Sequence, residues 1–345
     1  MRTTVARLVT LALLLAACSP SEAAESTSTS STTSTSSTTT STSTTSTTLE
    51  IPETSLINGL PVDDPTLMER RVLGVKIDNH PLARPQSGID QADMVVEMLV
   101  EGITRFITIW HESDAEYLGP NRSGRPTDAN LLPAFNEPTF TISGAQGWVQ
   151  NMITSNGVNL IKELSNGTFR ISGRRAPHNL YVDTSVLRET ADERGYPDLP
   201  PEGPIWEFGP LPSDGLPASS VQVNFARNTV VWVWDETEGM WLRTADGREA
   251  MVRDQEGNET RLGVPVMVAL YTSQYSVNGL PSSEVTGSGE AYVFADGKYV
   301  AGTWEREELT DWFTLTDADG NVITVPPGKI WVSLVPTNSG LTITE

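Results

Sequence analysis

Apolar and polar positions alternate differently in the two halves of the chain. In the first half, four short apolar runs predict strands, at residues 72–77, 94–100, 106–110 and 139–143. Residues 148–155 have helical spacing and stop just before Gly157, a residue that favours the end of a helix. Thr127 or Asp128 is suited to cap a second, short helix. We therefore expect the first half to mix strands and helices.

The second half is dominated by β-branched and aromatic residues in strand-like runs, at residues 221–225, 230–234, 241–244 and 264–271. Asp-Gly pairs lie between apolar runs and predict tight turns. Two hairpins are expected, one pairing 291–294 with 299–304 and one pairing 313–316 with 322–325. Residues 196–217 are dense in Pro and Gly and indicate a loop or a boundary. The folded chain is thus divided into a mixed α/β part, 50–200, and a β-rich part, 218–345.

The N-terminus has the pattern of a signal peptide. Arg2 and Arg7 precede an apolar run, 8–17, that is far too short to span a bilayer of about 30 Å. The run ends in Leu-Ala-Ala-Cys, which resembles a lipobox, so residues 1–18 predict a lipoprotein signal peptide with Cys18 as the lipidated residue. Two acyl chains, such as palmitate, on a diacylglycerol at Cys18 would anchor the chain stably to the extracytoplasmic face of the cell membrane. The alternative is an ordinary signal peptide with an incidental cysteine, although Cys18 is the only Cys in the chain.

Residues 19–49 are rich in Ser and Thr and bury too little apolar surface to fold. We expect a disordered tether between the membrane and the folded part. Its many hydroxyl groups are also a hypothetical site of O-glycosylation.

Net charge and histidine spacing exclude several kinds of partner. The formal net charge is −21, which argues against binding to nucleic acid, because phosphate backbones are bound through clustered Lys and Arg. The 3 His show no metal-binding spacing and no Cys remains in the folded part, so no metal and no cofactor are expected. Protein partners are left open by the sequence.

Several arginines lie in polar stretches beside Gly, Ser or Pro and stand out in a chain with 23 Lys and Arg. Arg122, Ser123 and Arg125 come just before the predicted short helix, where backbone N–H groups favour an anion. The alternative is that these arginines form structural salt bridges with some of the 44 Asp and Glu. The set comprises Arg84, Arg105, Arg122, Arg125, Arg174 and Arg175.

Two further groups carry possible acid–base chemistry. Glu97 and Glu101 are four residues apart and could converge as the two carboxylates of a glycosidase, or could simply position an arginine. His80 or His178 could act as a general base and activate a serine such as Ser123. No nucleophile-elbow motif accompanies them, and histidines that only fix loops by hydrogen bonds are the alternative. The catalytic residues therefore stay unknown, and so does whether the protein is an enzyme.

Longer segments resemble one known family. They are residues 75–88 (VKIDNHPLARPQSG), 92–97, 100–106, 119–126, 176–181, 287–289, 296–298, 302–304 and 327–331. Together they resemble the YerB-like lipoproteins, a family of bacterial envelope proteins without an established activity. The resemblance implies a mixed α+β fold, a layered ββα-type sandwich with a β-rich C-terminal half. Asn121 and residues 110–115, which include His111, depart from the family pattern.

These observations lead to one hypothesis and two alternatives. The leading hypothesis is a membrane-anchored extracytoplasmic lipoprotein that binds an anionic envelope ligand, such as a wall-polymer phosphate or a peptide carboxylate. The alternatives are a hydrolase or transferase acting on envelope polymers, and a protein-interaction module. The candidate pocket comprises Asp78, Asn79, His80, Arg84, Glu97, Glu101, Arg105, Arg122, Ser123, Arg125, His178 and Asn179.

Overall fold

The computed structural model describes residues 53–345, which belong to one compact unit of the chain, residues 49–345. The predicted signal peptide, Cys18 and the Ser/Thr-rich tether lie outside the described residues. Within residues 53–345, no helix is both long and apolar enough to cross a membrane.

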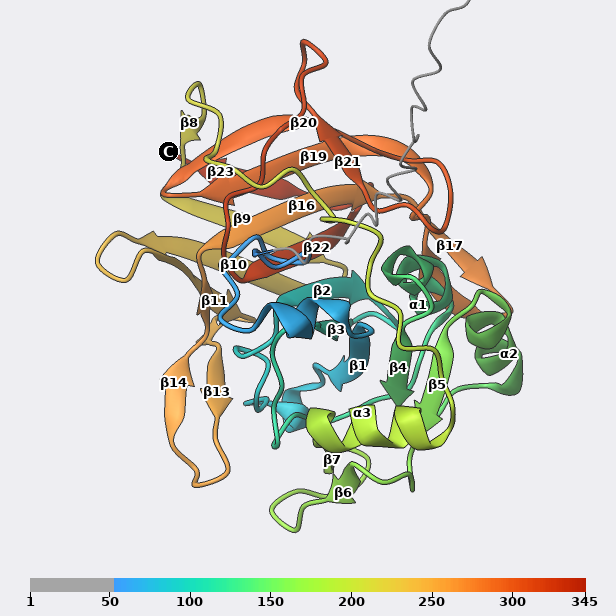
Figure 1. Ribbon diagram of the computed structural model, residues 1–345. Coiled ribbons are helices and arrows are strands. Elements are labelled where there is room, and N and C mark those ends of the chain that lie inside the picture. The colour runs from blue at the N-terminus through green and yellow to red at the C-terminus, as the bar shows by residue number, and fades with distance from the viewer. Residues whose placement is uncertain (1–52) are drawn as a thin grey trace, which may run out of the picture. The chain divides into compact units, whose positions relative to one another are not determined.

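An 11-stranded sheet runs through both halves of the chain (Figure 1). Its order is β21-β20-β19-β16-β22-β2-β3-β1-β4-β5, with β8 paired to β20. The first half contributes β1 (Leu73–Asp78), β2 (Met94–Leu99), β3 (Thr104–Trp110), β4 (Thr139–Ile142) and β5 (Asn159–Lys162). The second half contributes β8 (Leu216–Pro217), β16 (Val266–Thr272), β19 (Gly287–Ala295), β20 (Lys298–Arg306), β21 (Thr314–Thr316) and β22 (Ile330–Pro336).

The two halves meet inside this sheet, where β2 and β22 pair in parallel with Met94 opposite Ile330. On its other side β22 pairs in parallel with β16. Every residue of β22 is buried, as expected for a central strand covered on both faces. The halves therefore share one core.

A smaller sheet covers one face of the large one. Its order is β12-β11-β10-β9-β23, with β15 paired to β11. The strands are β9 (Ser220–Phe225), β10 (Asn228–Asp235), β11 (Met240–Ala245), β12 (Arg248–Glu249), β15 (Gly263–Val264) and β23 (Leu341–Thr344). Inward-facing residues of β9 alternate with outward-facing ones, and Trp232 of β10 meets Trp331 of the large sheet edge to face at 5.2 Å. Trp232 and Trp241 are therefore core residues.

Helices α1 (Pro126–Leu131) and α2 (Gly147–Ser155) pack on the opposite face of the large sheet. Val149 and Ile153, four residues apart on α2, join the apolar side chains of that face. Helix α3 (Thr184–Glu193) lies on the same face as the small sheet, through Leu187 and Ala191. The layers are thus small sheet, large sheet and helices, and the predicted mixed α+β fold with a β-rich second half is confirmed.

Short elements complete the fold. The single-turn helices are η1 (Pro65–Glu69), η2 (Pro81–Ala83) and η3 (Leu132–Phe135). Three two-stranded hairpins pair β6 (Thr168–Arg170) with β7 (Leu180–Val182), β13 (Met251–Arg253) with β14 (Glu259–Arg261), and β17 (Gln274–Val277) with β18 (Leu280–Ser283). The hairpin of β13 and β14 projects from the body of the unit in Figure 1.

Two expectations from the sequence need correction. Helix α1 starts two or three residues earlier than predicted: Arg125 is the N-cap residue and Asp128 the third helical residue, whose carboxylate accepts the Arg125 N–H at 2.7 Å. The second predicted hairpin forms only in part: β21 pairs along β20, whereas residues 322–325 contact β21 through one antiparallel bridge, Val322 to Thr316, and the Ile323 N–H, which donates to the Leu315 carbonyl at 2.9 Å.

Candidate functional site

The segment that ends at Arg122 pairs with the last residues of β1. The Asp78 N–H donates to the carbonyl oxygen of Pro120 at 2.9 Å, and the Arg122 N–H donates to that of Lys76 at 2.8 Å. Asn121 lies between them, and its side-chain amide donates to the carbonyls of Lys76 and Thr141 at 2.9 and 3.1 Å. Asn121 therefore ties β1 to β4, which gives this departure from the family pattern a structural role.

Asp78 is the centre of the group that this segment creates. Its side chain is 1 % exposed, and Oδ2 lies 2.7 Å from Nδ1 of His178 and 3.2 Å from Nε of Arg122. Its other oxygen accepts the His80 N–H at 3.0 Å. The imidazole of His80 stacks on that of His178, with centroids 4.7 Å apart and planes 17° apart. We call Asp78, His80, Arg122 and His178 the Asp78 cluster.

Two more arginines lie beside this cluster. Arg105 faces Asp78 across the β1–β3 pair and donates to the Ser123 carbonyl at 2.9 Å. Arg125 forms an ion pair with Glu101 at 2.6 Å, and Arg105 lies 3.9 Å from the same carboxylate. Burial first, and then the charge of Arg125, lower the pKa of Arg105 to about 10. Burial alone would raise the pKa of Glu101, but its backbone hydrogen bond and the two arginines outweigh burial and lower it.

The charges in this region do not balance. Arg105, Arg122 and Arg125 carry three positive charges, whereas Asp78 and Glu101 carry two negative ones. The buried Nε of Arg105 has no hydrogen-bond partner among the described residues, and the buried Nε of Arg122 has only its ion-pair contact with Asp78, without the geometry of a hydrogen bond. An excess of cationic N–H donors in an acidic protein is a chemical basis for anion recognition.

Other members of the predicted pocket point elsewhere. Asn79 follows Asp78 directly, yet its amide donates to Thr104 Oγ1 at 2.7 Å and its oxygen accepts from Arg84 at 2.9 Å. Arg84 also pairs with Asp246 at 2.7 Å. Asn179 contacts Arg170 and the carbonyl of Ile171. These three residues therefore border the Asp78 cluster without joining its contacts.

The two glutamates do not converge. Glu97 is fully buried and pairs with Arg243 at 2.6 Å, while its second oxygen accepts the indole N–H of Trp331 at 3.1 Å. Glu101 is 42 % exposed and pairs with Arg125. With separate partners and opposite exposure, they do not form the carboxylate pair of a glycosidase, so that interpretation is dropped.

Arg174 and Arg175, the remaining arginines of the predicted set, are not in the cluster's ion pairs. Arg174 donates to the carbonyls of Ala83 and Pro85 and so fixes the loop after His80. Arg175 is exposed.

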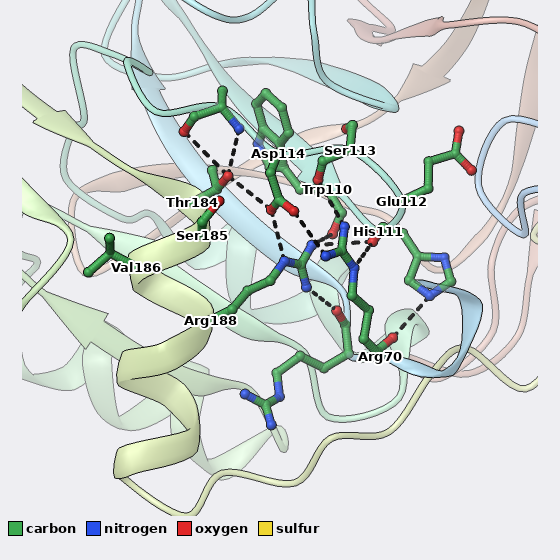
Figure 2. Close-up of polar contacts among 12 residues, drawn as sticks. Arg70, Trp110, His111, Glu112, Ser113, Asp114, Thr184, Ser185, Val186 and Arg188 are labelled. Carbon is green, nitrogen blue, oxygen red and sulfur yellow. Dashed lines mark hydrogen bonds and ion pairs between the residues drawn. The ribbon is translucent and has the colours of Figure 1, made fainter. Parts of the chain in front are cut away.

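A second polar network, which the sequence did not indicate, is centred on Asp114 (Figure 2). Its carboxylate accepts from Arg70 and Arg188, each at 2.9 Å, and from Thr184 at 3.0 Å. Arg188 belongs to α3, so the network joins this helix to the loop after β3. Both arginines share this one carboxylate and also donate to backbone carbonyls, so the arrangement is structural.

A further buried arginine was also missed. Arg243 of β11 lines a cavity of about 210 Å³, together with residues of the loop after β1. It shares a strand face with Trp241 and Ala245, which are both buried, so its inward direction follows from the two-residue period of a strand. Across residues 53–345, no three His, Cys, Asp or Glu side chains come together in a way that could hold a metal ion.

Comparison with known proteins agrees with this architecture. Residues 57–197 match the family model described as the N-terminal domain of a protein of unknown function (DUF3048), and residues 221–332 match the C-terminal domain of the same family. The chain is 27 % identical over 289 residues to YerB of Bacillus subtilis (strain 168), which is named as a candidate lipoprotein; the alignment covers 80 % of this chain and 85 % of YerB. The crystal structure of B. subtilis YerB matches with a TM-score of 0.72 and 25 % identity, covering 84 % of this chain and 99 % of that one. The chain therefore belongs to the YerB-like lipoproteins, the DUF3048 family of unknown function.

Proposed function

We propose that this protein is anchored by a lipid on Cys18 at the extracytoplasmic face of the cell membrane and binds an anionic ligand of the envelope. The lipobox-like Leu-Ala-Ala-Cys motif and membership of a lipoprotein family support the anchor. Mass spectrometry of the purified chain tests it: the mature N-terminus should be Cys18 with attached acyl chains, and a Cys18→Ser variant should lack them.

The observation that carries ligand binding is the excess of guanidinium groups around Asp78 and Glu101. Arg105, Arg122 and Arg125 lie close enough for the charge of each neighbour to lower the pKa of Arg105. An anion would relieve this repulsion and accept hydrogen bonds from guanidinium N–H groups whose hydrogen bonds are incomplete, such as Nε of Arg105. A phosphate of a wall polymer or the carboxylate of a wall peptide has this chemistry.

A thermal-shift screen of the mature chain with Cys18→Ser tests the proposal, with phosphorylated sugars, teichoic-type polymers and wall peptides as probes. A ligand at 100 times its dissociation constant should stabilise the fold by about 2.7 kcal/mol. The thermal shift should become much smaller in Arg122→Ala. It should remain in the control Arg253→Ala, because Arg253 is an exposed arginine that also forms an ion pair, with Glu259. Equal shifts in both variants would assign binding to another surface.

One observation favours a second candidate, a hydrolase or transferase acting on envelope polymers. The Asp78–His178 contact of 2.7 Å orients the imidazole as the carboxylate does in acid–base pairs, leaving Nε2 for a proton transfer. His178 would then act as the general base and Asp78 would position it. Incubation of wall fragments with the protein separates the two candidates: turnover that changes fragment mass and disappears in His178→Ala supports the enzyme, and intact fragments support binding.

A further inference from the structure

The cavity beside Arg243 lies between segments that are distant in the chain. One wall is the loop after β1, with Arg84 and Pro85; the other is formed by β11 and the strands that follow it, with Arg243 and Arg248. Its volume of about 210 Å³ is below the range of about 300–1,000 Å³ typical of drug-sized ligands, so it suits a compact group. It extends from exposed Arg248 to Arg243, whose side chain is 2 % exposed.

Arg243 is unusual because most of its hydrogen-bonding capacity is unused. A guanidinium has five N–H donors, and the described residues provide one acceptor, Glu97 Oε1 at 2.6 Å from Nη2. Its Nε is buried without a hydrogen-bond partner among those residues. Buried donors of this kind are rare in native proteins and call for an explanation such as a ligand.

Aromatic rings hold the guanidinium in place. Its central carbon lies 5.0 Å from the ring centre of Trp331, 5.4 Å from Phe106 and 5.5 Å from Trp232. These rings stabilise the charge through their faces, but they do not replace an oxygen acceptor. The arginine is therefore fixed in position at the wall of the cavity, with part of its hydrogen-bonding capacity unused.

The remaining walls limit the chemistry of an occupant. Phe106, Leu262 and Met251 provide apolar surface. The carboxylates of Glu97, Asp246 and Glu249 offset the charges of the three arginines, so a doubly charged phosphate would gain little. A planar carboxylate matches a guanidinium fork and carries a single charge.

We propose that this cavity is a second binding site, distinct from the Asp78 cluster, for a compact organic acid. The carboxylate of the acid accepts hydrogen bonds from Arg243, with Arg84 and Arg248 nearer the solvent. The apolar body of the acid packs against Phe106 and Leu262. Because the walls come from both halves of the chain, the occupant also links the two halves.

The test uses 4-fluorobenzoate as the probe and fluorine NMR line broadening as the readout, on the mature chain with Cys18→Ser. The neutral isostere 4-fluorobenzamide measures the contribution of the charge. We expect the benzoate to bind at least about tenfold more tightly than the amide, as for the loss of one charge-assisted hydrogen bond.

Two variants test whether the probe binds in this cavity. Ala250→Trp fills the cavity from a half-buried position and keeps every charge, and Arg243→Met with Glu97→Gln removes the buried pair together so that neither charge is left alone. Each should lower the affinity for 4-fluorobenzoate by about tenfold or more. Arg170→Ala, an exposed arginine paired with Glu163, should leave the affinity unchanged. Unchanged binding in Ala250→Trp, equal binding of acid and amide, or no broadening of the acid would overturn the proposal.

Discussion

His178 donates a hydrogen bond from Nδ1 to the buried carboxylate of Asp78 over 2.7 Å, although 100 residues separate them in the chain. The adjacent ring, that of His80, makes the opposite choice, because its Nδ1 accepts the Leu82 N–H at 3.1 Å. The two stacked imidazoles thus use the same nitrogen, Nδ1, in opposite roles, one as donor and one as acceptor.

This arrangement predicts opposite tautomers for the two neutral rings. His178 should carry its proton on Nδ1 and His80 on Nε2, because a carboxylate needs a donor and a backbone N–H needs an acceptor. Long-range proton–nitrogen NMR spectra distinguish the two forms. Asp78→Ala should abolish the preference of His178 and leave that of His80; the same tautomer for both rings in the parent would contradict the geometry.

The sequence predicted local elements well and spatial order poorly. Strands β1, β2, β3 and β9 follow from runs of β-branched and apolar residues, since those patterns are local. The central place of β22 does not, because pairing between Val96 and Val332 depends on the whole topology. Helix α3 was also missed, although Asp183 accepts from the N–H groups of Ser185 and Val186 as an N-cap residue does.

The same distinction applies to the site. Asp78, His80, Arg122 and His178 could be selected from the sequence because they lie at the end of an apolar run or in the polar segments between such runs. Arg243 could not be selected in that way, because its partner Glu97 is 146 residues away and lies in an otherwise apolar strand. Residue type and loop context identify candidates, whereas ion-pair partners depend on the fold.

The buried pair of Lys76 and Asp128 predicts a strong double-mutant effect. Both side chains are 0 % exposed and their charged atoms are 2.6 Å apart. Burial lowers the pKa of Lys76 to about 8, against the opposing charge of Asp128. Lys76→Met should destabilise the fold by about 3–5 kcal/mol, because the carboxylate of Asp128 loses its partner.

Adding Asp128→Asn to Lys76→Met should restore part of that loss, since no unpaired charge then stays buried. Urea denaturation of the parent, both single variants and the double variant measures the coupling. Costs that simply add would show that the two charges do not stabilise one another.

His111 predicts a loss of stability in mild acid. Its Nε2 lies 3.0 Å from the Arg70 carbonyl, and its Nδ1 is buried without a hydrogen-bond partner among the described residues (Figure 2). Burial and then the charge of Arg188 lower the pKa of His111 from 6.5 to about 4. The folded protein therefore keeps this ring neutral, whereas the unfolded chain takes up a proton near pH 6.5.

Below pH 6.5 the unfolded state binds more protons, so the free energy of unfolding falls as the pH decreases towards 4. The contribution of His111 is fully present above pH 6.5, and about 3 kcal/mol should be lost across this interval. Urea titrations between pH 7 and pH 4 measure the slope. His111→Gln, which retains an N–H donor for Arg70 but does not titrate, should have a shallower one; an unaltered slope would assign the effect to other groups.

The position of β22 predicts that both halves unfold together. Residues 330–336 lie between β16 and β2, so the first half reaches the rest of the large sheet only through a strand of the second. A fragment of residues 53–217 would leave β2 as an open edge with unpaired backbone groups and would expose the apolar faces of β1 and β3. We expect the mature chain to show one calorimetric transition whose measured enthalpy equals its van't Hoff enthalpy, and the fragment to show no cooperative transition. Two resolved transitions in the mature chain would mean that the β2–β22 contact is too weak to couple the halves, whatever core they share.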